Sequence, residues 1–141
     1  MKKENIDYYI GIDPGTITGI AVWDTKEQKF DMIKSGGILE MMNSLTFYTC
    51  WGNNIFIIEN PNLRKWYGKN TKGKDQGAGS IKRDYKIWVE WFAINGCKFQ
   101  EINPKDVVTK LTSQNFKALT GWTERTNSHA RDAAMMVFKK G

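Results

Sequence analysis

The chain has 141 residues, 40% of them hydrophobic, and a formal net charge of +6. This length can bury one core without disulfide bonds, and Cys50 and Cys97 show no CxxC spacing, so we expect two reduced thiols. No apolar run reaches the ~20 residues of a membrane span, and no signal-type segment follows the charged start. We therefore expect a cytoplasmic protein rather than a membrane protein.

The first part of the chain predicts strands that follow one another closely. Residues 6–12, 19–23 and 30–34 are rich in apolar and β-branched residues and are separated by short turns. Connections this short join antiparallel neighbours, so we expect a meander. Residues 38–47 then place apolar residues at helical spacing. Residues 54–59 form a nearly continuous apolar run, which is typical of a buried central strand.

A basic stretch follows at residues 61–86. It holds eight basic and two acidic residues, whereas the remainder of the chain has 13 of each and is neutral. All of the excess positive charge therefore lies in one stretch, which favours contact with a polyanion such as nucleic acid. A solvated loop without a partner is the alternative interpretation.

The end of the basic stretch predicts a helix with one apolar face. Ile81, Tyr85, Trp88 and Phe92 recur at i, i+4, i+7 and i+11, and they form one stripe on such a helix. Trp88 and Phe92 are expected either in the core or at a dimer face. Residues 97–102 then predict a fifth strand.

Capping residues and a glycine mark the helices beyond that strand. Asn103 is expected to cap a helix that starts at Pro104, and a short helix over residues 114–119 is expected to end at Gly121. Ser128 is expected to cap the last helix. Small and apolar residues lie on the inner side of that helix: Ala130, Ala133, Ala134, Val137 and Phe138.

This order of elements predicts an α/β fold with a mixed five-stranded sheet. The first three strands form the antiparallel meander, the fourth and fifth strands are parallel, and helices lie on both faces. The first and fourth strands can then lie side by side. No repeat and no interdomain linker interrupts the pattern, so residues 1–141 are expected to form a single domain.

Four residues spread along the chain suggest a metal site. Asp13 and Glu59 each end an apolar strand, and the ends of neighbouring parallel strands are where α/β proteins place their ligands. His129 and Asp132 are three residues apart near the start of the last helix, so they share one face of it. Three carboxylates and an imidazole are what a divalent-metal site needs.

Three motifs stand in order along the chain: Gly11-Ile12-Asp13-Pro14-Gly15, then Ile58-Glu59, then His129-Ala130-Arg131-Asp132-Ala133-Ala134. Together they resemble the RuvC family of Holliday-junction resolvases, and the resemblance spans residues 8–138. It implies an RNase H-like nuclease domain, a homodimer and Mg²⁺-dependent nicking of four-way DNA junctions. The short chain is similar to phage and viral versions of the family, and a phage-encoded member would act in the host cytoplasm.

By position, the resemblance makes Asp13, Glu59, His129 and Asp132 the catalytic, metal-binding set. Hydrolysis of a phosphodiester agrees with this, because two Mg²⁺ ions about 3.5–4 Å apart activate the water and stabilise the leaving oxygen. We expect Asp13 to bridge both ions and Glu59 and Asp132 to complete one shell each, with His129 as a ligand or a proton carrier. Hard oxygen ligands suit Mg²⁺, and Mn²⁺ is expected to substitute.

The residues expected to contact DNA are basic or aromatic. In the basic stretch they are Arg64, Lys65, Trp66, Tyr67, Lys69, Lys72, Lys74, Lys82 and Arg83, and on helices after the fifth strand they are Lys105, Lys110 and Lys117.

Two other classes of protein fit part of the pattern. A non-catalytic module could bind branched or single-stranded DNA through the basic stretch. An actin-like nucleotide-binding fragment would share the first glycine motif, but that fold needs two such domains around its nucleotide. The presence of all four candidate metal ligands favours the nuclease over both.

Overall fold

The structure is a computed structural model that describes residues 4–63 and 72–141; for residues 72–78 it describes the helix but not the side chains. The strands are β1 (Tyr8–Asp13), β2 (Thr18–Asp24), β3 (Lys29–Gly36), β4 (Asn54–Glu59) and β5 (Lys98–Ile102). The helices are α1 (Ile38–Ser44), α2 (Thr46–Cys50), α3 (Lys72–Asn95), α4 (Ser113–Thr120) and α5 (Ser128–Val137). Two 3₁₀ turns are η1 (Pro61–Leu63) and η2 (Pro104–Asp106).

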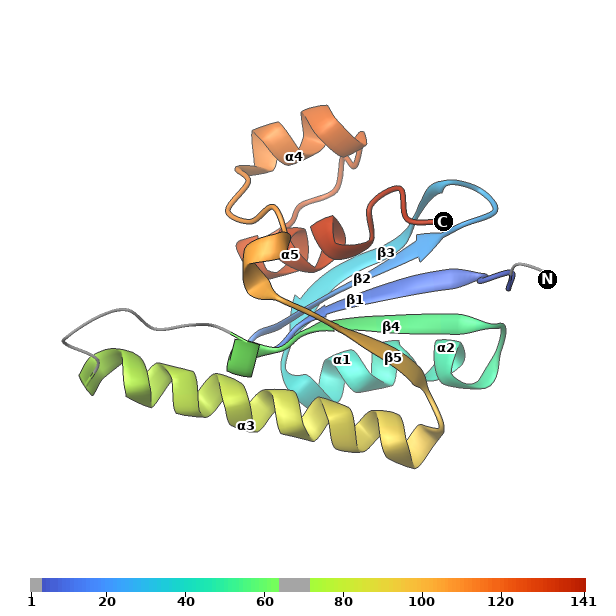
Figure 1. Ribbon diagram of the computed structural model, residues 1–141. Helices are drawn as coiled ribbons and strands as arrows, with labels where there is room; N and C mark the ends of the chain where they lie inside the picture. Colours follow the sequence, from blue (N-terminus) through green and yellow to red (C-terminus); the bar gives the residue numbers. More distant parts are fainter. Residues whose placement is uncertain (1–3, 64–71) are drawn as a thin grey trace.

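The strands form one mixed sheet in the order β3-β2-β1-β4-β5 (Figure 1). The β1–β2 and β2–β3 pairs are antiparallel, and the β1–β4 and β4–β5 pairs are parallel. The predicted α/β fold, with a meander followed by two parallel strands, is therefore confirmed. The two strands with carboxylates at their ends, β1 and β4, are neighbours near the middle of the sheet.

Helices cover both faces of this sheet (Figure 1). Ile10 and Ile12 of β1 pack with residues of α1, α2 and α3 on one face. On the opposite face α5 lies along β1 and β2, with α4 beyond it. Because side chains alternate along a strand, Gly11 and Asp13 belong to the α5 face.

The stripe on α3 is part of the core. Tyr85, Trp88 and Phe92 are buried against the sheet, and Ile81 lies at the margin with 36% of its surface exposed. The predicted helix is confirmed, but the dimer-face interpretation of Trp88 and Phe92 is wrong, because both are fully buried within the chain. Within residues 4–63 and 72–141, no helix has the length and apolarity to cross a membrane.

The helix predicted over residues 38–47 is two helices. Leu45, which is fully buried, separates α1 from α2, and α2 continues to Cys50. Leu39, one of the apolar residues of this segment, is 76% exposed. The side chains that α1 contributes to the core include those of Met41 and Met42, which are both buried.

The helix predicted to start at Pro104 is a single 3₁₀ turn. Asn103 caps it as expected, its side chain accepting a hydrogen bond from the Lys105 N–H at 3.2 Å. The turn ends at Asp106, where the β-branched residues 107–109 disfavour a helix. Lys105 therefore lies on a 3₁₀ turn, and Lys110 lies on no helix, contrary to expectation.

The two helices that follow agree more closely with the sequence. α4 ends at Gly121, whose φ of 77° is the left-handed conformation that favours glycine. α5 is capped by Asn127 rather than Ser128: the Asn127 side chain accepts a hydrogen bond from the Ala130 N–H at 2.9 Å. Ser128 is the first residue of the helix.

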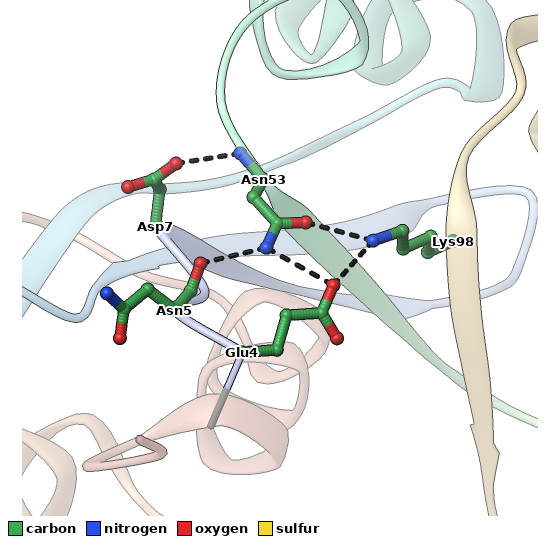
Figure 2. A network of polar contacts seen from close by, with 5 residues as sticks. All are labelled: Glu4, Asn5, Asp7, Asn53 and Lys98. Atoms are coloured by element: carbon green, nitrogen blue, oxygen red, sulfur yellow. Dashed lines mark hydrogen bonds and ion pairs between the residues drawn. The ribbon is translucent and has the colours of Figure 1, made fainter. Parts of the chain in front are cut away.

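A polar network closes the sheet at the amino ends of β1, β4 and β5 (Figure 2). The Asn53 amide donates to the Asn5 carbonyl at 2.8 Å, and its backbone N–H donates to the Asp7 carboxylate at 2.7 Å. The Lys98 ammonium bonds the Asn53 carbonyl oxygen at 3.1 Å and the Glu4 carboxylate at 2.6 Å. Each donor in this network meets an acceptor.

Candidate active site

Two acidic residues end neighbouring strands at the opposite end of the sheet. Ile12 of β1 pairs with Ile58 of β4, so the next residues, Asp13 and Glu59, end adjacent parallel strands at the same edge. The Asp13 side chain is 14% exposed and Glu59 is 8% exposed. Strand alternation puts both on the face that α5 covers. The sequence prediction that β1 and β4 bring these two positions together is confirmed.

Glycines in the sheet let the backbone of α5 approach this edge. Gly19 is paired with Asp13, and a Cβ atom on Gly19 would lie 2.0 Å from the His129 carbonyl oxygen. A Cβ atom on Gly11 would lie 2.3 Å from the Ala133 carbonyl oxygen. Real Cβ atoms do not come this close to another heavy atom, so only glycine fits at either position. The first turn of α5 is thus held directly above the strand next to Asp13.

This placement brings His129 to Asp13. The His129 Nδ1 lies 3.3 Å from the Asp13 Oδ2, with the imidazole 47% exposed and the carboxylate largely covered. The contact is a hydrogen bond whose donor depends on the tautomer, and it becomes an ion pair when the imidazole is protonated. One side of the imidazole therefore faces a largely covered carboxylate while the ring itself remains accessible from solvent.

Asp132 is held by the loop before α4. Its Oδ1 accepts a hydrogen bond from the backbone N–H of Lys110 at 3.1 Å. Lys110 has a φ of 61°, the left-handed region that L side chains rarely adopt. Nothing in the sequence pattern predicted this partner, because a backbone donor has no signature in the side-chain pattern.

The donor types at this edge fit a hard divalent ion, since carboxylate oxygens are the ligands that Mg²⁺ and Mn²⁺ prefer. Over the part of the chain that the structure describes, however, no three His, Cys, Asp or Glu side chains are grouped closely enough to hold an ion. Asp13 and Glu59 are the carboxylates that the sheet places side by side. A four-residue metal site that includes His129 and Asp132 stays a prediction.

Two asparagines that the sequence analysis did not single out support the site. Asn127 caps α5 and also donates to the Ser35 hydroxyl at 2.6 Å, which ties the start of α5 to β3. Asn60, directly after Glu59, donates from its side chain to the Glu101 carboxylate at 2.9 Å and from its backbone to the Ile102 carbonyl at 3.0 Å. The sequence signal that could have identified these two residues is an asparagine directly after a strand-ending acid or directly before a helix.

The residues expected to contact DNA are described only in part. Arg64, Lys65, Trp66, Tyr67 and Lys69 lie outside the described residues, and Lys72 and Lys74 are described only as part of α3. Lys105, Lys110 and Lys117 are exposed on the chain between β5 and α5, and Lys82 and Arg83 lie on α3. Arg83 contacts the buried Asp84 through its Nε at 3.5 Å, with two thirds of its side chain exposed.

No protein-family model matches the sequence, and no curated protein matches it either. Among solved structures, one similar fold is that of T. thermophilus RuvC in complex with a Holliday junction substrate. The likeness has a TM-score of 0.66 and covers 94% of this chain and 91% of that chain, at 12% sequence identity. The fold is RNase H-like. The expected fold is thereby confirmed, and at this identity the likeness establishes the fold alone.

Proposed function

We propose that this protein is a metal-dependent endonuclease that resolves four-way DNA junctions by paired, symmetric nicks. The observation that supports this most is that Asp13 and Glu59 end neighbouring strands of an RNase H-like sheet while His129 contacts Asp13. A solved protein with a similar fold is RuvC, in complex with a Holliday junction substrate. The three sequence motifs that contain these residues point to the same family.

The proposed chemistry assigns a task to each side chain. Asp13 and Glu59 would hold Mg²⁺, or Mn²⁺ in its place. Bound there, the ions supply an activated water and neutralise charge on the scissile phosphate. His129, in contact with Asp13, orients that carboxylate and can carry a proton to or from solvent. Asp132 completes the set from the same face of α5.

DNA contact is assigned to the basic side chains on both sides of this edge. The segment between β5 and α5 contains Lys105, Lys110 and Lys117, and the basic stretch begins shortly after the end of β4. Phosphate contacts of this kind give affinity that does not depend on sequence and that falls with salt. Trp66 and Tyr67 are proposed to stack on unpaired bases at the junction.

Two symmetric nicks require two active sites, so we propose a homodimer with twofold symmetry. The outer side of α3 is the proposed interface. Ile87 and Ile94 lie seven residues apart, on one face of the helix, and are 37% and 77% exposed. Sedimentation at micromolar concentration tests this, and a monomer that still makes both nicks would contradict it.

A synthetic four-way junction, labelled on one strand at a time, provides the test of function. The protein should nick two opposed strands symmetrically in Mg²⁺ or Mn²⁺ and none in EDTA, and it should leave linear duplex of the same sequence intact. Asp13→Asn and Glu59→Gln should each lower the nicking rate by at least about a hundredfold while junction binding stays equal or tightens, because a repelling charge is lost.

Glu27→Gln is the matched control, since Glu27 is an exposed acid in the turn between β2 and β3, at the other end of the sheet. It should cut at the wild-type rate. Wild-type cutting by Asp13→Asn would contradict the proposed site. Tight junction binding without any cutting by the wild type would favour the alternative, a non-catalytic module that binds branched DNA.

A further inference from the structure

Arg131 lies between the two candidate site residues of α5, and its side chain bonds to neither of them. Its Nε donates to the Leu111 carbonyl at 2.8 Å. Its Nη1 donates to the Thr126 carbonyl at 2.9 Å and to the Thr126 hydroxyl at 3.0 Å. Leu111 precedes α4 and Thr126 follows it, so one guanidinium fastens both ends of the α4 segment to α5.

The acceptors of Arg131 are all uncharged, so this is not an ion pair. A planar guanidinium can donate in several directions at once, whereas a lysine ammonium is a single flexible point charge. The side chain is partly buried, where its hydrogen bonds are less exposed to competing water. The arrangement therefore uses the geometry of arginine rather than its charge.

The Leu111 contact is connected to Asp132 through the backbone of the neighbouring residue, Lys110. Lys110, the preceding residue, has the left-handed φ of 61°, and in that conformation its N–H donates to the Asp132 Oδ1 at 3.1 Å. By holding the Leu111 carbonyl, Arg131 holds the chain in the conformation that directs this N–H at Asp132. The contact with Thr126 acts on the other side, because Asn127, the cap of α5, is the next residue.

We propose that Arg131 is a positioning residue for the site. It fixes the orientation of the Asp132 carboxylate through Leu111 and Lys110, and it fixes the start of α5, and so His129, through Thr126 and Asn127. The proposal rests on the proposed function for its activity readout. It adds that Lys110 has two separable tasks: its side chain contacts DNA, and its backbone N–H holds Asp132.

Arg131→Ala and Arg131→Lys test the first part, with Arg125→Ala as the matched control, because Arg125 is an exposed arginine six residues earlier, in the loop between α4 and α5. Hydrogen bonds to metal-binding side chains typically change affinity or activity by 10–100-fold when lost. Arg131→Ala should therefore lower kcat and raise the half-saturating Mg²⁺ concentration by about tenfold or more, with KM for the junction within about twofold. For Arg131→Lys, kcat and the half-saturating Mg²⁺ concentration should lie between the values for Arg131→Ala and for wild type.

Amide hydrogen exchange at Lys110 gives a readout that needs no activity. The Lys110 N–H should exchange at least about tenfold faster in Arg131→Ala than in wild type, and at the wild-type rate in Arg125→Ala. If Arg131→Ala does not fold, Arg131→Lys carries the same comparison. A wild-type protein that cuts no junction contradicts the proposed function, while this exchange experiment still decides the role of Arg131.

Two substitutions at Lys110 test the second part. Lys110→Gly removes the side chain but keeps the N–H and takes the left-handed φ freely, so KM should rise while the Mg²⁺ requirement stays at the wild-type value. Lys110→Pro has no N–H and cannot take that φ, so KM and the Mg²⁺ requirement should both rise. Equal Mg²⁺ requirements in the two variants, or wild-type exchange and Mg²⁺ dependence in Arg131→Ala, would overturn the proposal.

Discussion

The two ends of the central strands contain polar clusters of opposite design. At the amino end, Asn53 connects Glu4, Asp7 and Lys98, and each donor meets an acceptor or a charge of opposite sign (Figure 2). At the carboxyl end, the sheet brings Asp13 and Glu59 side by side. The first arrangement stabilises the fold by itself. The second places two acids at neighbouring strand ends in a partly buried place, where His129 contacts one of them and like charges oppose each other.

Removing the close approach of α5 should have the largest effect at the carboxyl end. In Gly19→Ala the new Cβ meets the His129 carbonyl oxygen, so α5 must shift away from β2 and His129 must leave Asp13. We expect a loss of about 3 kcal/mol in the free energy of unfolding, at the upper end of overpacking effects, measured by urea denaturation.

Gly79→Ala is the control for that substitution. Gly79 lies in α3, and a Cβ there would meet nothing within 4 Å. Alanine should stabilise this helix by about 0.5–1 kcal/mol. If Gly19→Ala unfolds at the wild-type urea concentration, the backbone contact between α5 and the sheet is not as close as the structure describes.

Neutralising one acid at the carboxyl end should reveal the charge conflict. Asp13→Asn should raise the melting temperature in EDTA at neutral pH, because it removes part of the repulsion from Glu59. Mg²⁺ should stabilise the wild type by about 2.7 kcal/mol at a hundredfold excess over its dissociation constant, and the variant by much less. Equal responses of both proteins to Mg²⁺ would show that Asp13 is not part of a metal site.

Breaking the amino end should act in the opposite direction. Asn53→Ala removes the side-chain bonds to the Asn5 carbonyl, Glu4 and Lys98 and should destabilise the fold by about 1–2 kcal/mol, with or without Mg²⁺. Asn43→Ala, at an exposed position of α1, should stay within about 0.5 kcal/mol of wild type. If Mg²⁺ changes the melting temperature of Asn53→Ala more than that of wild type, the two ends of the sheet do not differ in the way proposed.

The smallest effect concerns pH at the amino end. Hydrogen bonds from Lys98 and then Asn53 lower the pKa of Glu4 below its ordinary value of 4.5. A lowered pKa in the folded state means that this contribution to stability is present above the ordinary pKa and is lost as pH falls through the lowered value. Lys98→Met should therefore show a shallower fall in melting temperature on the acid side. Identical acid-side curves would show that the pair contributes nothing.

The part of the site that strand patterns determine could be predicted from the sequence. The apolar run that ends at Glu59 is typical of a buried central strand, and β4 has the predicted bounds. Once β1 and β4 are parallel neighbours, the proximity of Asp13 and Glu59 follows. The role of Gly19 could also have been predicted, because a glycine inside a strand often marks the close approach of another backbone.

The rest depends on backbone geometry that side-chain patterns do not encode. Asn127 and Ser128 are both good capping residues, and in the structure Asn127 caps α5. The cap at Asn103 was correct, but it begins only a single 3₁₀ turn. The Lys110 N–H reaches Asp132 only because Lys110 takes a positive φ that nothing in its residue type favours.

The attachment of α4 has an evolutionary consequence. The segment from Thr112 to Thr126 leaves and rejoins the body of the protein at two points that Arg131 holds together, and it buries Phe116 as its anchor in the core. It contributes no strand to the sheet. A lineage can therefore lengthen, shorten or recombine this segment while the sheet and α5 keep their arrangement.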